Sequence, residues 1–227
     1  MKKIVYMFGA AVVAATVAGC ASPSAYVDAQ DTTRAVLNTN NMSSADWVVI
    51  TQEAGNAMLN SFQFEDFLMA YAEDAVANAP ADMSARERRT ITKPLLALFT
   101  IQNNTGEHID TRLLTNRLRE ILFNSGKVRF TTYAAGQGQD IDEATAAARD
   151  LAYDPNVKAS SVMPENAVNA YDLSLSGSII KQRASSGRDH EISYFFSLTL
   201  TDNFTGEGVW TYTKEIKRQH REGVFGM

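Results

Sequence analysis

The sequence predicts an α+β protein, in which helices flank a mixed, mostly antiparallel sheet of about four to five strands. Three observations predict this class. Strand and helix patterns alternate through most of the chain, three strand patterns then follow one another, and the connections between those three are short. Consecutive strands with short connections form antiparallel hairpins, whereas the alternating part favours helices packed on the sheet.

Two helices are predicted near the start of the folded part. Ser43 precedes Asp46 by three positions, the spacing of a capping box, and apolar residues at helical spacing follow over 44–61. A second helical pattern covers 64–77 and ends before Pro80. We expect its apolar stripe to pack in the core, and the alternative is an exposed groove for a partner. The stripe comprises Phe64, Phe67, Leu68, Tyr71 and Ala75.

The middle of the chain alternates between short strands and helices. An apolar run over 95–101 predicts a buried strand, and the polar stretch 103–106 predicts a turn after it. Asp110 is placed to cap a helix that runs to Leu122. Beyond this helix we expect a strand over 127–133, a helix over 140–152 and a loop over 153–169.

The last third predicts three consecutive strands, which cover 171–183, 191–201 and 209–217. Trp210 and Tyr212 are two residues apart and therefore share one face of the last strand. We expect that face to pack under helices; if exposed, the two aromatic side chains would form a protein-binding hot spot. Together with Arg183, at the end of the first of these strands, Trp210 and Tyr212 are the residues that we predict to contact a protein partner.

The N-terminus has the pattern of a secretory signal. Lys2 and Lys3 precede an apolar stretch over 4–17, and Val-Ala-Gly stands directly before Cys20, the one cysteine of the chain. The stretch is shorter than the roughly 20 apolar residues that a membrane-spanning helix needs. The pattern resembles the lipobox of bacterial lipoproteins, which implies cleavage before Cys20 and its acylation; the alternative is an ordinary secretory signal with a chance cysteine. Ala21, where an inner-membrane lipoprotein often has Asp, implies the outer membrane.

The chain of 227 residues therefore divides into three expected segments. These are a signal peptide over 1–19, the lipidated Cys20 with a flexible tether over 20–42, and a globular domain over 43–227 with a helical insertion near 62–93. Without the signal, 208 residues remain, with 19 basic and 26 acidic side chains and a formal charge of −7. This charge argues against nucleic-acid binding, which usually needs a basic face.

One basic cluster stands out against this acidic background. We expect it to be solvated, and the alternative is a contact to an acidic partner or to phospholipid headgroups. The cluster comprises Arg86, Arg88, Arg89 and Lys93.

No motif points to catalysis, a cofactor or a metal ion. His108 and Asp110 flank Ile109, but a solvated turn explains this pair better, because a metal site needs more ligands at defined spacing. An envelope enzyme is kept as an alternative. It would lose activity, with its fold intact, when one of four residues becomes Ala: His108, Asp110, His190 or Asp202.

Several segments follow one another in an order typical of one family. The most distinctive is an apolar strand followed by Asp, Thr-Gly-Glu and Val-Trp, over 198–210. The others are the helix end 57–61, the strand and Asn-Xaa-Thr turn over 94–105, the helix start 109–111, Ser-Gly-Lys at 125–127, and the strand with its Gly over 171–179. With the lipobox and tether before them, these segments resemble the LpoB family over about 44–219. Members of that family are outer-membrane lipoproteins that activate bifunctional penicillin-binding proteins.

The resemblance implies a fold like the N-terminal domain of TolB, without a catalytic site. It implies a lipoprotein that acts in peptidoglycan synthesis and cell shape, and whose partner is a bifunctional penicillin-binding protein in the inner membrane. Docking would activate that partner allosterically. This sequence departs from the family in its short tether and in residues 169–172. The alternative is a structural or secretion-assembly envelope lipoprotein of the curli-secretion type.

Overall fold

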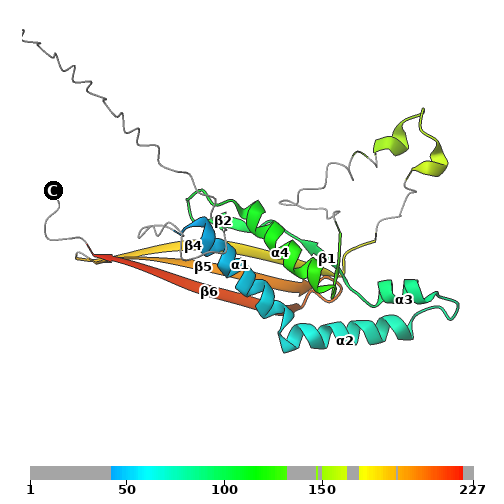
Figure 1. Ribbon diagram of the computed structural model, residues 1–227, viewed down its shortest axis with the longest axis horizontal. Helices are drawn as coiled ribbons and strands as arrows, with labels where there is room; N and C mark the ends of the chain where they lie inside the picture. Colours follow the sequence, from blue (N-terminus) through cyan, green and yellow to red (C-terminus); the bar gives the residue numbers. More distant parts are fainter. Residues whose placement is uncertain (1–41, 132–146, 148–149, 163–168, 188, 222–227) are drawn as a thin grey trace, which may run out of the picture.

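The computed structural model describes residues 42–131, 147, 150–162, 169–187 and 189–221, which form a six-stranded sheet with helices (Figure 1). The helices are α1 (Ser44–Leu59), α2 (Phe62–Ala77), α3 (Ala85–Ile91) and α4 (Thr111–Ser125), with short 3-10 helices at Leu151–Tyr153 and Ala159–Ser161. The strands are β1 (Leu95–Leu98), β2 (Gln102–Asn104), β3 (Arg129–Phe130), β4 (Leu173–Ser186), β5 (Asp189–Asp202) and β6 (Gly208–Arg221). The predicted α+β class is confirmed.

The sheet has a parallel half and an antiparallel half. Its strand order is β3-β1-β4-β5-β6, and β2 pairs with β4 farther along that strand. β1 runs parallel to β3 and β4, whereas β4, β5 and β6 form two successive antiparallel hairpins. The register places Lys181 opposite Tyr194 and Leu198 opposite Tyr212. Because side chains alternate between the faces, this register decides which residues of the three long strands meet on the covered face.

The core lies between one face of the sheet and the pair α1 and α4, which lie side by side over it (Figure 1). Trp47 of α1 meets the Tyr194 ring edge-on, with ring centroids 5.7 Å apart. Burying one large apolar side chain stabilises the fold by about 1.5–3 kcal/mol. The buried residues keep the period of their elements: Ile50, Ala54 and Met58 in α1, Leu114, Leu118 and Leu122 in α4, and Tyr194, Phe196, Leu198 and Leu200 in β5.

The predicted start signals of two helices are confirmed in atomic detail. Asp46 N donates to Ser43 Oγ at 3.2 Å and Ser43 N donates to Asp46 Oδ2 at 2.9 Å, which completes the capping box of α1. Asp110 accepts from Leu113 N at 3.1 Å at the start of α4. Gly126 ends α4 in the left-handed conformation, with a φ of 65°.

Two elements were not predicted from the sequence. Residues 102–104 form β2, although 103 and 104 were expected in a turn. The long strand β4 extends beyond the end of β1, and its residues Ser178–Ile180 pair with β2 there. The charged stretch 81–93 contains α3, which begins with a capping box of Ser84 and Glu87. Both differences arise where local composition is polar but a backbone or side-chain partner is available.

Several expectations fall outside the described residues. They concern the signal peptide, Cys20 with the tether, the last two residues of the strand over 127–133 and most of the helix over 140–152. In the part of the chain that the structure describes, no helix is long and apolar enough to cross a membrane.

Candidate protein-binding site

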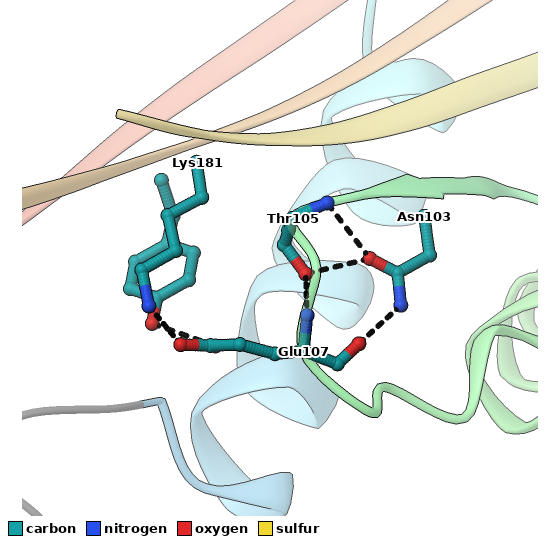
Figure 2. A network of polar contacts seen from close by, with 5 residues as sticks. Asn103, Thr105, Glu107 and Lys181 are labelled. Carbon is teal, nitrogen blue, oxygen red and sulfur yellow. Dashed lines mark hydrogen bonds and ion pairs between the residues drawn. The ribbon is translucent and has the colours of Figure 1, made fainter. Parts of the chain in front are cut away.

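A charged network fixes the loop between β2 and α4 onto the sheet (Figure 2). Lys181 projects from the covered face of β4 and forms an ion pair with Glu107. Tyr194, its neighbour on β5, donates its hydroxyl to the other oxygen of the same carboxylate at 2.8 Å. The Lys181 ammonium also lies 5.2 Å from the centre of the Tyr194 ring, within reach of a cation–π interaction.

The loop itself is held by its own side chains. Asn103 Oδ1 accepts from the backbone and hydroxyl of Thr105, at 3.1 Å and 2.7 Å, and Asn103 Nδ2 donates to the Glu107 carbonyl at 2.7 Å. Thr105 Oγ1 in turn accepts from Glu107 N at 3.0 Å. The Asn-Xaa-Thr turn identified in the sequence therefore has a clear role. It orients the backbone so that the Glu107 carboxylate reaches Lys181 (Figure 2).

This ion pair is largely withdrawn from water. The Lys181 side chain is 3% exposed and that of Glu107 is 20% exposed. Burial lowers the pKa of Lys181, and the positive charge of Arg183 lowers it further. A buried ammonium keeps its charge only if an anion and good hydrogen bonds compensate the lost hydration, and Glu107 supplies that anion. The network makes this end of the sheet rigid and dependent on one carboxylate.

A pocket of about 380 Å³ opens beside the network, between the start of α1 and the loop that leads into α4. Its walls combine apolar side chains with an acidic rim of Glu107 and Asp110; the apolar part includes Met42, Trp47, Ile109 and Leu114. Arg218 of β6 pairs with Asp46 at 2.8 Å and so ties the start of α1 to the sheet next to this pocket. Among the described residues, five apolar and four polar ones line it, a mixture that suits binding of a partner side chain with an apolar body and a polar end.

A second polar centre lies at the opposite end of β4. Asp172 Oδ2 accepts from Leu95 N at 2.6 Å and from the Tyr71 hydroxyl at 2.9 Å. Its backbone carbonyl accepts from Asn203 N at 2.9 Å. Burial and the hydrogen bond to Asp172 raise the pKa of Tyr71 to about 12. Asp172 thus joins α2, β1, β4 and the turn between β5 and β6.

The structure separates the three residues that the sequence singled out as partner contacts. Arg183 is exposed and follows Lys181 by two positions on the same face of β4, near the Glu107 network. Tyr212 lies level with Gly177, six residues farther back along β4, which corresponds to about 20 Å. The three residues therefore do not form one patch.

Trp210 and Tyr212 lie on the helix-covered face, as in the first of the two arrangements considered for them. They stack with ring centroids 5.9 Å apart, are half-buried and pack against the core. Burial and the nearby Glu53 carboxylate raise the pKa of Tyr212 to about 12. Similarly, the α2 stripe of Phe64, Phe67 and Leu68 faces the core.

The remaining candidates lie on the surface. His108 is exposed, Asp110 caps α4, and no group of three or more potential metal ligands occurs among the described residues. In the basic cluster, Arg88 donates to the carbonyls of Ala81 and Met83, both at 3.3 Å, and so holds the loop before α3. Cys20 lies outside the described residues.

The sequence reasoning missed Glu107 and Lys181, although one of them carries a readable signal. Leu173, Leu175 and Ile179 set the period of the buried face of β4, and Lys181 continues that period. A lysine on the buried face of a strand is rare unless it is paired, so the position of Lys181 alone predicts an acidic partner on another element. Nothing local distinguishes Glu107 from the other acidic loop residues.

Comparisons with known proteins place the chain in a family. No curated protein matches it. Similar solved structures include the LpoB C-terminal domain from Escherichia coli, which is 12% identical with a TM-score of 0.31 and covers 66% of this chain and 94% of its own. Lipoprotein GNA1162 from Neisseria meningitidis is 14% identical with a TM-score of 0.32, over 56% of this chain and 83% of its own.

The sequence model of one family covers most of the domain. The model of the peptidoglycan-synthase activator LpoB matches residues 63–216, which is more than half of the chain. The match includes both hairpins, the Glu107 network and Asp172. The chain therefore belongs to the LpoB family of peptidoglycan-synthase activators.

Proposed function

We propose that this chain is an outer-membrane lipoprotein that binds a bifunctional penicillin-binding protein and activates it allosterically. The match to the activator family over residues 63–216 carries this proposal. Such a protein acts as a ligand of its enzyme. It binds the more active state of the synthase more tightly than the less active one and so raises the population of the active state.

Each segment then has one task. Cys20, acylated at the mature N-terminus, holds the chain in the outer membrane, facing the periplasm. The tether supplies reach, and the domain from Ser43 onward supplies recognition. Each buried CH₂ of the acyl chains adds roughly 0.8 kcal/mol, so several chains together give a lasting anchor.

The rigid end of the sheet around Glu107 supports a recognition role. The pocket beside the network has a preformed shape, since the capping box, the Arg218–Asp46 pair and the Glu107–Lys181 pair all hold its walls. A preformed site loses little conformational entropy on binding. Arg183, exposed at the same end, remains a proposed contact, as do Trp210 and Tyr212, which are half-buried on β6.

The test is lipid II polymerisation by the bifunctional penicillin-binding proteins of the same organism, with and without residues 21–227. We expect a several-fold, saturable acceleration of one synthase. Arg183→Glu is expected to weaken the response, while Arg119→Glu, a reversal of another exposed arginine on α4, serves as the control. No acceleration and no binding to any of these synthases would refute the proposal and favour an assembly lipoprotein.

A further inference from the structure

Phe204 is the most exposed large hydrophobic side chain in the described part of the chain, with 96% of its surface accessible. It stands at the tip of the turn between β5 and β6, among polar residues and a glycine. A single exposed apolar residue is ordinary on a protein surface. Phe204 differs because many hydrogen bonds fix the backbone beneath it.

The turn is held from within by Asp202 and Thr205. The Asp202 carboxylate accepts from Phe204 N at 2.9 Å and from the Thr205 hydroxyl at 2.8 Å. Thr205 Oγ1 accepts from Glu207 N at 3.2 Å, and Gly206 N donates to Asp202 O at 2.8 Å. Gly206 has a φ of 78°, a conformation that glycine adopts without strain.

The turn is also bound to the rest of the fold. Asn203 N donates to the Asp172 carbonyl at 2.9 Å, and Ser174 Oγ donates to Asn203 Oδ1 at 2.9 Å. Asp172 in turn holds β1 and α2, as described above. The backbone that carries Phe204 is therefore anchored to three elements. Because the backbone is already ordered, binding of Phe204 costs only the rotamer entropy of its own side chain.

We propose that Phe204 is an anchor residue that inserts into an apolar pocket of the peptidoglycan synthase, an inference that rests on the proposed function. Large aromatic side chains that fill a pocket are typical hot spots of protein interfaces. Asp202 and Glu207 flank Phe204, and residues 202–207 contain no lysine or arginine. The matching pocket should therefore have basic residues at its rim.

The same charges argue against the other occupants. Anionic lipid attracts lysine and arginine, so a turn with two acidic and no basic side chains is unsuited to a lipid surface. In a second copy of this chain, the pocket at the start of α1 is lined by Glu107 and Asp110 and, among the described residues, by no lysine or arginine, so it offers no basic group to pair with Asp202 and Glu207. Such a pairing would also be heterologous, with the turn of one copy in the pocket of the next, and contacts of this kind form open filaments unless the rotation between copies closes a ring.

The experiment measures the affinity of residues 21–227 for the same organism's bifunctional synthase, in its wild-type form and in three variants. Phe204→Ala is expected to weaken binding by about 30-fold, the size of a hot-spot loss, and Phe204→Leu to retain most of the affinity. Phe62→Ala removes the same side chain from the start of α2, where Phe62 is 73% exposed, and is expected to leave binding unchanged. Thermal unfolding should show the same Tm for wild type and Phe204→Ala.

The outcomes separate the Phe204 inference from the proposed function. If the wild type binds the synthase and Phe204→Ala binds equally well, the anchor inference is wrong and the proposed function stands. If the wild type binds no synthase, both are wrong. A parallel measurement uses vesicles of phosphatidylethanolamine and phosphatidylglycerol. If vesicles retain the wild type and release Phe204→Ala, the anchor serves a lipid surface, and the protein-pocket inference is overturned.

Discussion

The two ends of the central strand β4 are held by different chemistry. At one end, Lys181 and Glu107 form a buried pair of full charges. At the other end, the Asp172 carboxylate is satisfied by neutral donors, the Leu95 amide and the Tyr71 hydroxyl. Removing one partner of a buried charge pair leaves the other as an uncompensated charge, which costs about 3–5 kcal/mol. A neutral donor that loses its acceptor costs less, about 1–3 kcal/mol. The Glu107 end should therefore be the less tolerant of substitution.

The largest expected effect is that of Glu107→Ala. It leaves Lys181, with a 3% exposed side chain, as an unpaired buried charge, and we expect the free energy of unfolding to fall by about 3–5 kcal/mol. Urea unfolding of the wild type and the variant measures the change. The double variant Glu107→Gln with Lys181→Met, which removes both charges, should recover much of the loss. A loss below about 1 kcal/mol for Glu107→Ala would contradict a dominant role of the buried charge.

Gly177→Ala probes the middle of the strand, between the two ends. An added Cβ would lie 2.5 Å from Leu198 Cδ2 and 2.9 Å from the Ser197 carbonyl, so neighbouring atoms must move. We expect a loss of about 1–3 kcal/mol in unfolding free energy. Gly208→Ala is the matched control, because a Cβ there meets no atom within 4 Å, and its stability should stay close to that of the wild type. Equal stability of the two variants would show that β5 yields at this position.

Asp172→Ala tests the second end directly. It leaves the Leu95 amide and the Tyr71 hydroxyl without their acceptor, and we expect a loss of about 1–2 kcal/mol because the site is only partly buried. Asp172→Asn retains one acceptor oxygen and should lose less. Hydrogen exchange of the Leu95 amide measures the local effect. A loss as large as that of Glu107→Ala would remove the distinction between the two ends.

The smallest effect is a dependence of stability on alkaline pH. The pKa of Tyr71 is raised from 10.0 to about 12, so the folded chain holds this proton more tightly than the unfolded chain. Unfolding then releases a proton between these two values, and the free energy of unfolding falls as pH rises from about 10 to about 12. Urea unfolding across that range should show a shallower decline for Tyr71→Phe than for the wild type. Identical slopes would mean that Tyr71 titrates normally in the folded state.

Most helices and strands could be predicted from local signals, because the interactions that define them join residues only a few positions apart. Helix ends are set by residues that are neighbours in sequence. Examples are the Ser43–Asp46 capping box, the Asp110 cap and Gly126 in the left-handed conformation. The alternating β5 and its glycine-containing turns likewise need no distant partner to be recognised. The family resemblance, confirmed by the match over 63–216, draws on the same ordered local patterns.

The candidate sites depend on contacts between distant residues. Glu107 lies 74 positions from Lys181, and Tyr71 lies 101 positions from Asp172. Neither pair has a signature of spacing, and only the register of β4 against its neighbours makes Lys181 a buried residue. The separation of Arg183 from Trp210 and Tyr212 is also a result of register, since all three occupy the same face.

By itself, the sequence determined the starts of α1 and α4, the three long strands, the α+β class and the family, because capping, periodicity and turn chemistry are local properties of the chain. The tertiary structure alone decided that β2 joins the sheet, that Lys181 needs Glu107, and that Asp172 holds the turn that presents Phe204. These features exist because burial removes water from polar groups and forces each one to find a partner elsewhere in the chain.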